Sequence, residues 1–220
     1  PQLLLLSGVG PADQLRALDI PVVVDRPGVG RNLRDHLELY IQYACKKPIT
    51  LYRATRPWNK VWIGLQWLIW QRGPGASAHL EAGAFIRSRP GVEHPDLQYH
   101  FLPSVVWDHG RVPPDRHAFQ AHAGPMRPTS VGHLQLRSAD PTEHPLIQPN
   151  CLSTEGDRQE MRDAVRLSRE IFAQPAFDPY RGEEMAPGAD VVSDGEIDAF
   201  VRQKADSAYH PCGTCRMGLD

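Results

Sequence analysis

Short runs of alternating apolar and polar residues, each bounded by Pro, Gly or Ser, constrain the fold of this 220-residue chain most strongly. Such alternation is typical of strands whose two faces meet different surroundings, and short turns between them favour antiparallel neighbours. We predict an antiparallel sheet from the runs 79–86, 96–102, 118–124 and 131–137, and a further strand over 37–44.

The main helical patterns follow these runs in the sequence. Ser153 or Thr154 caps a long amphipathic helix that reaches about residue 174, and Ser193 with Glu196 forms a capping box for a helix ending near 204. Strands followed by helices predict an α+β fold in which helices back the sheet.

The first thirty residues predict smaller elements. Residues 3–6 end a helix at a glycine-rich stop, and 11–18 form a short helix with Pro in its first turn. Residues 20–24 predict a buried strand, and 27–30 form a tight loop. The first residue is not Met and the helix pattern lacks its beginning, so we expect a fragment of a longer polypeptide.

Residues 58–70 place apolar residues at helical spacing: Trp58, Val61, Trp62, Leu65, Leu68 and Ile69. Such a helix either lies on a membrane surface or packs on the sheet. We favour packing on the sheet, because only Lys60 and Arg72 could meet lipid headgroups.

The overall composition excludes several classes of protein. A net charge of −2 without a basic stripe argues against nucleic-acid binding. The sequence has no run of eighteen apolar residues, so we predict no membrane-spanning helix. The four cysteines do not have the spacing of a secreted disulfide framework, which favours a reducing compartment.

His210 is the strongest candidate for a functional residue. It stands in the run Tyr209-His-Pro-Cys-Gly-Thr-Cys-Arg-Met-Gly-Leu219, after a helix and directly before Pro211, which ends regular structure. The pair Gly213–Thr214 lets backbone approach a flat ligand without a Cβ in the way. This arrangement could hold an imidazole against a cofactor ring.

A second candidate group lies in Asp35-His-Leu-Glu38. If a strand runs through it, His36 and Glu38 share a face, where an imidazole and a carboxylate could position a hydroxyl and neutralise a cation. The alternative is a solvated strand end. His100 lies within the run 96–102 and is either a hydrogen-bonded structural residue or part of a site.

Three weaker patterns remain. Cys212-Gly-Thr-Cys215 has redox spacing but follows a helix instead of opening one. A zinc site would need two more ligands; His210 could be a third, but Cys45 and Cys151 are single, so we expect no metal site. Gly28-Val-Gly30 is half of a dinucleotide fingerprint, and we interpret it as a turn. The remaining histidines are expected to be mostly solvated: His79, His94, His109, His117, His122, His133 and His144.

Three stretches together resemble one family. Residues 1–11 resemble the second signature of the glucose–methanol–choline (GMC) oxidoreductases, cut at its N-terminal edge. Residues 27–36 resemble the family's next conserved stretch, and 209–218 its active-site histidine motif. The order and spacing agree over the whole chain, and the choline-oxidising members are the most similar.

The resemblance implies an FAD domain with a dinucleotide fold and an antiparallel substrate domain. Residues 1–35 would belong to the FAD domain, 36–205 to the substrate domain, and 206–220 to an active-site segment returning to the flavin. The FAD-binding GxGxxG and a second catalytic Asn or His would lie outside this chain, so we expect the chain alone to be inactive. Four residues would lie at the cofactor: Asp35, Pro211, Gly213 and Thr214.

The implied reaction is oxidation of choline to betaine aldehyde, with hydride transfer to the flavin and His210 as base. Glu38 would bind the ammonium group, and His36 and His100 would shape the pocket. A tryptophan of relatives is replaced by Leu80, which leaves Tyr209 and Phe101 as aromatic candidates.

Several alternatives and properties stay open. The chain could belong to another GMC alcohol dehydrogenase or oxidase, to a non-catalytic binding module, or to a thiol-redox protein. The resemblance implies a cytoplasmic or peripherally membrane-associated protein in bacteria and a mitochondrial one in animals, and it names no electron acceptor.

Overall fold

The computed structural model describes residues 1–107 and 110–218. The chain divides into two compact units, which are described separately. The first contains residues 1–37, 127–158 and 207–220, and the second contains 38–126 and 159–206. The predicted range 36–205 is thus not one unit, because 127–158 groups with the two ends of the chain. The assignment of FAD and substrate domains stays a prediction.

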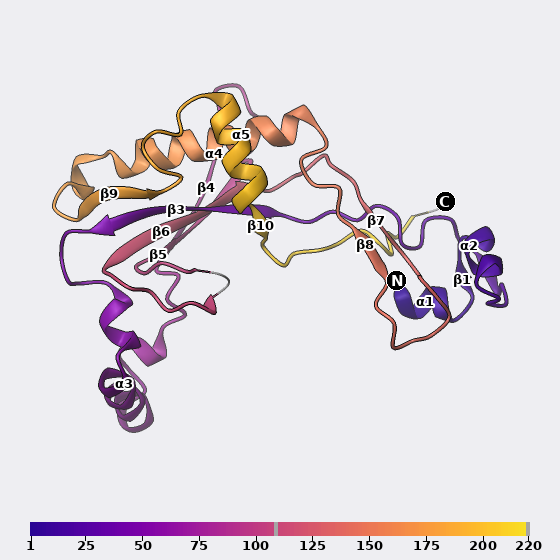
Figure 1. Ribbon diagram of the computed structural model, residues 1–220, viewed down its shortest axis with the longest axis horizontal. Coiled ribbons are helices and arrows are strands. Elements are labelled where there is room, and N and C mark those ends of the chain that lie inside the picture. The colour runs from indigo at the N-terminus through magenta and orange to yellow at the C-terminus, as the bar shows by residue number, and fades with distance from the viewer. Residues whose placement is uncertain (108–109, 219–220) are drawn as a thin grey trace. The chain divides into compact units, whose positions relative to one another are not determined.

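A six-stranded sheet forms the second unit, in the order β10–β3–β6–β5–β4, with β9 also paired to β3 (Figure 1). The registers of β3, β4, β5, β6 and β9 are antiparallel, which confirms the predicted α+β class. The strands are β3 (Leu37–Cys45), β4 (Ala82–Ile86), β5 (Leu97–Leu102), β6 (Ala118–Pro125), β9 (Arg181–Ala186) and β10 (Asp206–Ser207).

The two faces of this sheet differ in chemistry. In β3, Leu39, Ile41 and Tyr43 are buried on one face. Because side chains alternate along a strand, Glu38, Tyr40 and Gln42 point to the other face. The register continues both faces into β6 and β5. The sheet therefore has an apolar face and a face rich in polar side chains, which we call the polar face.

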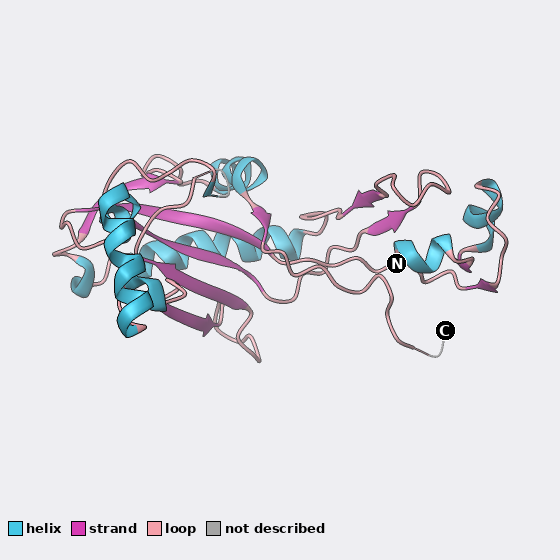
Figure 2. Cartoon of the chain, turned by 90° about the horizontal axis from the view of Figure 1, so that it is seen from below, coloured by secondary structure: helices cyan, strands magenta, loops and turns pink. Residues whose placement is uncertain are grey.

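Helix α4 (Glu155–Phe172) covers the apolar face with its part in this unit (Figures 1 and 2). Its buried residues recur at helical spacing: Met161, Ala164, Val165, Ser168 and Phe172. The Phe172 ring lies 5.1 Å from that of Tyr43 and 5.3 Å from that of Phe119. The Tyr99 hydroxyl donates to the Ala164 carbonyl, and burial raises the pKa of Tyr99 to about 12, so it remains a donor.

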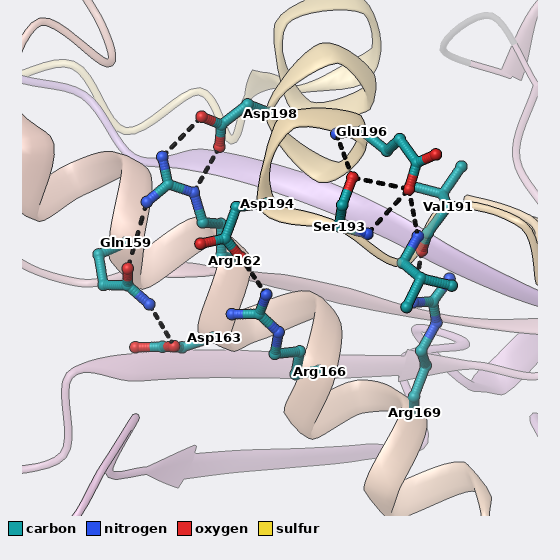
Figure 3. Close-up of polar contacts among 11 residues, drawn as sticks. Gln159, Arg162, Asp163, Arg166, Arg169, Val191, Ser193, Asp194, Glu196 and Asp198 are labelled. Carbon is teal, nitrogen blue, oxygen red and sulfur yellow. Dashed lines mark hydrogen bonds and ion pairs between the residues drawn. The ribbon is translucent and has the colours of Figure 1, made fainter.

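Helix α5 (Asp194–Lys204) is joined to α4 by polar contacts (Figure 3). Arg162 donates to both carboxylate oxygens of Asp198, at 2.7 and 2.6 Å. The predicted capping box is confirmed: the Glu196 N–H donates to Ser193 Oγ, and the Glu196 carboxylate accepts from the Ser193 N–H.

Helix α3 (Pro57–Trp70) is confirmed as a helix, but its predicted packing on the sheet is wrong. None of its residues is buried, and Trp58 is 86% and Leu68 71% exposed. It lies on the side of the sheet away from α4 (Figures 1 and 2). The physical reason is that its apolar residues surround the helix, so no single face is specified for the sheet. Across the described ranges, no helix is long and apolar enough to cross a membrane.

The first unit is made of smaller elements around the buried residues Leu5, Leu15, Ile20 and Leu136. Helices α1 (Gln2–Leu6) and α2 (Ala12–Ala17) and the parallel pair β1 (Val9–Gly10) and β2 (Val24–Asp25) come from its N-terminal segment. Strand β7 (His133–Gln135) pairs with β8 (Leu146–Gln148). Short 3₁₀ turns of the second unit complete the elements: η1 (Leu51–Thr55), η2 (Pro74–Ala76) and η4 (Pro175–Phe177).

Two predictions for this unit are corrected. The run 20–24 is not a buried strand: Ile20 and Val22 pack on the core, but β2 begins only at Val24, and Val23 and Val24 are 69% and 37% exposed. The run 131–137 does not join the main sheet, since β7 pairs only with β8 among the described strands.

Asp157, in the first turn of α4, fixes residues 129–130 of the first unit. It accepts hydrogen bonds from the backbone N–H groups of Thr129 and Ser130 and from the Thr129 hydroxyl. Burial of the carboxylate opposes its ionisation, but these hydrogen bonds outweigh burial and lower the pKa of Asp157. The ionised carboxylate therefore stabilises the folded unit.

Removing the carboxylate of Asp198 tests the contact between α4 and α5. The side chains of Arg162 and Asp198 are 9% and 14% exposed, and breaking a pair of this kind from one side costs about 3–5 kcal/mol. We expect Asp198→Asn to lower the free energy of unfolding by about 3 kcal/mol in urea denaturation. Arg166→Gln, in the exposed pair with Asp194, should cost below about 1 kcal/mol. Equal losses of unfolding free energy in the two variants would contradict a larger contribution of the buried Arg162–Asp198 pair.

The Asp157 carboxylate should make stability depend on pH. Its folded pKa lies below the unfolded value of about 3.9, so its contribution is present above that pH and is lost as pH falls through the folded pKa. Asp157→Asn should cost about 2 kcal/mol at pH 7, as for hydrogen bonds to a charged group. The variant's free energy of unfolding should then decline less steeply than the wild type's between about pH 5 and 3. Parallel pH profiles would count against this role.

Candidate active site

His210 lies on a segment that runs antiparallel to residues 30–36 within the first unit. Arg34 and Cys212 exchange backbone hydrogen bonds of 3.0 and 2.8 Å. The Ala208 N–H donates to the His36 carbonyl at 2.8 Å, and the Gly30 N–H to the Thr214 carbonyl at 2.9 Å. The backbone on both sides of His210 is thus fixed by main-chain bonds.

Asp35 clamps the turn that precedes His210. One carboxylate oxygen accepts from the His210 N–H at 3.0 Å, and the other accepts from the Ser207 hydroxyl. Ser207 Oγ accepts in turn from the Tyr209 N–H at 2.9 Å, and Tyr209 adopts a left-handed backbone with φ of 60°. Both oxygens of Asp35 are therefore engaged within this unit, and its predicted contact with a cofactor stays a prediction.

The side chains of His210 and His36 face each other. Their Nδ1 atoms are 3.2 Å apart, and the rings meet edge to face with centroids 5.3 Å apart. One Nδ1 must donate and the other must accept, so at least one of the two imidazoles is neutral in this arrangement. Since His210 is exposed, it combines a fixed backbone with an accessible imidazole, as a general base requires.

Gly213 permits a close backbone approach, but the partner belongs to the same chain. Its φ is 90°, and a Cβ there would lie 2.1 Å from the Asn32 carbonyl oxygen. The sequence predicted closeness to a flat ligand, whereas the structure shows closeness to residues 30–34.

The pair Cys212 and Cys215 is exposed and free, and it does not open a helix. No group of three or more metal-ligating side chains is found in residues 1–107 and 110–218.

Glu38 belongs to the polar face of the second unit. Its Oε1 lies 3.1 Å from His122 Nδ1, and both side chains are 15% exposed. The ring of Tyr40 lies 4.3 Å from that of His122. Strand β3 begins at Leu37, one residue after His36, so the predicted sharing of a strand face by His36 and Glu38 stays a prediction.

His100 lies on the polar face, because it pairs with His122 on β6 and with Gly83 on β4. Phe101 points to the apolar face and contacts Phe119, Phe172 and Phe177. The prediction that Phe101 is an aromatic neighbour of Glu38 is therefore wrong. Tyr40 is the aromatic residue on the polar face instead.

The expectation of solvated histidines is wrong for His122, which is mostly buried and bonded to Glu38 and Gln120. A signal was present: Gln120 and His122 are polar residues at alternate positions of an otherwise apolar strand. His117 is also bonded, to the Thr50 hydroxyl at 2.8 Å, and burial and the charge of Arg53 lower its pKa. His109 lies outside the described residues.

Among the pockets that adjoin the sheet in the described residues, two lie on its opposite faces. One of about 490 Å³ opens beside Tyr40, Gln42 and Trp107 and mixes polar and apolar walls. The other, of about 380 Å³, has an almost wholly apolar lining between α4 and the apolar face, which suits it poorly to a charged substrate.

Comparison with known proteins defines the class to which these residues belong. Residues 128–220 match the GMC oxidoreductase family model. The chain belongs to the GMC oxidoreductase family. It is 66% identical over 218 residues to the mitochondrial choline dehydrogenase of Mus musculus and 55% identical to the oxygen-dependent choline dehydrogenase of Brucella ovis. Both matches include 99% of this chain, but the chain spans only 37% and 40% of the length of those proteins.

Solved structures of the family share the fold. A pyridoxine 4-oxidase from Mesorbium loti is 29% identical with a TM-score of 0.80, covering 99% of this chain and 39% of that one. An Aspergillus oryzae formate oxidase studied for its FAD modification is 24% identical with a TM-score of 0.89, covering 98% and 42%. These neighbours and the family are flavoproteins that use FAD.

The segment around His210 fits a flavin in its chemistry. It is exposed and mostly uncharged, with Tyr209 71% and Met217 96% exposed. Its nearest carboxylate, Asp35, is occupied by hydrogen bonds from Ser207 and His210. A flat, largely apolar ring system could cover such a surface without burying an unpaired charge.

Proposed function

We propose that this chain is part of an FAD-dependent enzyme that oxidises choline to betaine aldehyde. The identity of 55–66% to choline dehydrogenases over 218 residues carries the proposal. A carboxylate on the polar face and an exposed, fixed imidazole support it, because a cationic alcohol needs both a negative partner and a base.

His210 acts on the hydroxyl of the alcohol. When bound, the flavin supplies the acceptor for the hydride from the α-carbon. As the hydride leaves, the imidazole takes the hydroxyl proton as a general base. His36 holds the His210 ring through its Nδ1, and the Asp35 clamp holds the backbone. Pro211, Gly213 and Thr214 lie next to the flavin in this proposal.

Glu38 binds the trimethylammonium group. That group has no N–H to donate, so its recognition depends on charge and on aromatic faces. The largely buried carboxylate supplies the charge, and Tyr40 supplies an aromatic ring on the same face of the strand. His100, a cross-strand neighbour of His122, shapes this pocket.

Another GMC alcohol oxidase is the second candidate, and the pyridoxine 4-oxidase neighbour favours it. A neutral alcohol has no use for a buried carboxylate, so Glu38 separates the two. A non-catalytic binding module would fold and bind ligand without flavin. The mouse relative is named as mitochondrial, which supports that compartment for an animal source, and the Brucella ovis relative is named as oxygen-dependent.

Replacing His210 tests the proposed base. In the full-length flavoprotein containing this chain, His210→Ala should slow flavin reduction by choline about 10²–10⁴-fold, as expected for loss of a general base. Stopped-flow absorbance of the flavin measures this rate. Cys212→Ser is the matched control, since Cys212 bonds to Arg34 through backbone atoms, which the substitution leaves in place. An unchanged rate at normal FAD content would exclude His210 as the base.

Neutralising Glu38 tests the substrate. Glu38→Gln should raise the KM of choline about 10–100-fold, as for removing the carboxylate partner of a largely desolvated cation. The KM of the neutral isostere 3,3-dimethyl-1-butanol should change little. Glu93→Gln, at an exposed carboxylate, is the control. Equal effects on both alcohols would favour the second candidate.

A further inference from the structure

A chain of hydrogen bonds runs behind Glu38 on the polar face. His122 Nδ1 faces Glu38 Oε1 at 3.1 Å, and His122 Nε2 faces Gln120 Nε2 at 2.6 Å. Gln120 Oε1 accepts from Gln42 Nε2 at 2.9 Å and from the Val106 N–H at 2.8 Å. Gln120 and Gln42 are 0% and 2% exposed, so solvent does not compete for these bonds.

The backbone of Val106 fixes the direction of the whole chain. A backbone N–H can only donate, so the Gln120 atom that faces Val106 must be the amide oxygen. The Val106 carbonyl accepts from Gln42 Nε2 at 3.3 Å, which fixes the second amide in the same way. The other terminal atom of Gln120, the one facing His122, is therefore its NH₂ group.

This direction determines the tautomer of His122. Because an amide NH₂ is only a donor, His122 Nε2 must be the unprotonated, accepting nitrogen. The ring proton then sits on Nδ1 and is donated to Glu38. An imidazolium would set the Nε2–H of His122 against the N–H of Gln120, so the hydrogen-bond chain favours the neutral ring.

A neutral donor has a specific consequence for the carboxylate. An imidazolium at 3.1 Å would cancel the charge of Glu38, whereas a neutral N–H orients the carboxylate and leaves its full negative charge. The Tyr40 ring also lies beside the His122 ring, at 4.3 Å, and His100 is its partner on the neighbouring strand β5.

We propose that His122 is a positioning residue that aims the Glu38 carboxylate at a quaternary ammonium substrate without neutralising it, with Gln120 selecting its tautomer. This proposal rests on the proposed function, in which Glu38 binds the cationic end of the substrate.

The first experiment reads the tautomer directly. In the full-length flavoprotein labelled with ¹⁵N-histidine, His122 is assigned by comparison with His122→Asn. We expect a pyridine-type Nε2 and a pyrrole-type Nδ1 at pH 7. A pyrrole-type Nε2, alone or with Nδ1, would overturn the proposal whatever the variants do.

The second experiment measures selectivity between choline and 3,3-dimethyl-1-butanol. His122→Leu removes the donor and should raise the KM of choline about tenfold more than that of the neutral alcohol. His122→Asn keeps an N–H near the position of Nδ1 and should recover most of the selectivity. In the Glu38→Gln background, His122→Leu should lose its selective effect, because coupled residues are not additive.

The outcomes separate this proposal from the proposed function. If Glu38→Gln leaves selectivity unchanged, the proposed function fails. If Glu38→Gln is selective while His122→Leu affects both alcohols equally, only the positioning role fails. His94→Leu, at an exposed histidine, is the control and should leave selectivity unchanged.

Discussion

The contact between α4 and the apolar face of the sheet is the constraint on which the second unit depends. Tyr43, Phe119 and Phe172 meet there, and each fully buried side chain of this kind contributes about 1.5–3 kcal/mol. Because side chains alternate, burying one set of β3 residues against α4 places Glu38, Tyr40 and Gln42 on the opposite face. A shift of one residue in the register would bury Glu38 under α4 and expose Ile41. The packing of the core thus decides which side chains can meet a substrate.

The polar face and the His210 segment use hydrogen bonds in different ways. Around His210, the bonds come from backbone atoms and from Asp35, and they fix the main chain while the ring stays exposed. Around Glu38, the buried amides of Gln42 and Gln120 hold the His122 side chain. The backbone of Val106 determines which atom donates and which accepts in each of these hydrogen bonds. In the proposed function, the base must be accessible to a proton, whereas the carboxylate that binds the cation must be held with its charge intact.

Periodicity alone predicted much of this fold. The α+β class, the strands near 37–44, 96–102 and 118–124, and the helices α4 and α5 follow from alternation, caps and apolar spacing. Sequence reasoning failed where tertiary partners decide. The Trp-rich α3 has no single apolar face to specify its packing, and the run 131–137 carries no sign of which strand it pairs with. His122 was missed because its role depends on Glu38, 84 residues away, and no spacing rule joins two strands across such a distance. His210, His36 and Glu38 were selected from local patterns, but their roles came from the family resemblance, and those roles stay predictions.

The bond between Asp35 and the His210 N–H joins residues 175 positions apart in the sequence. Contacts of such long range close a large loop and tend to form late, after local structure has reduced the entropy of the intervening chain. On a ribosome, residue 35 emerges long before residue 210 exists. The clamp therefore cannot close until synthesis has passed α5, and the exposed imidazole acquires its final orientation only after that helix has been made.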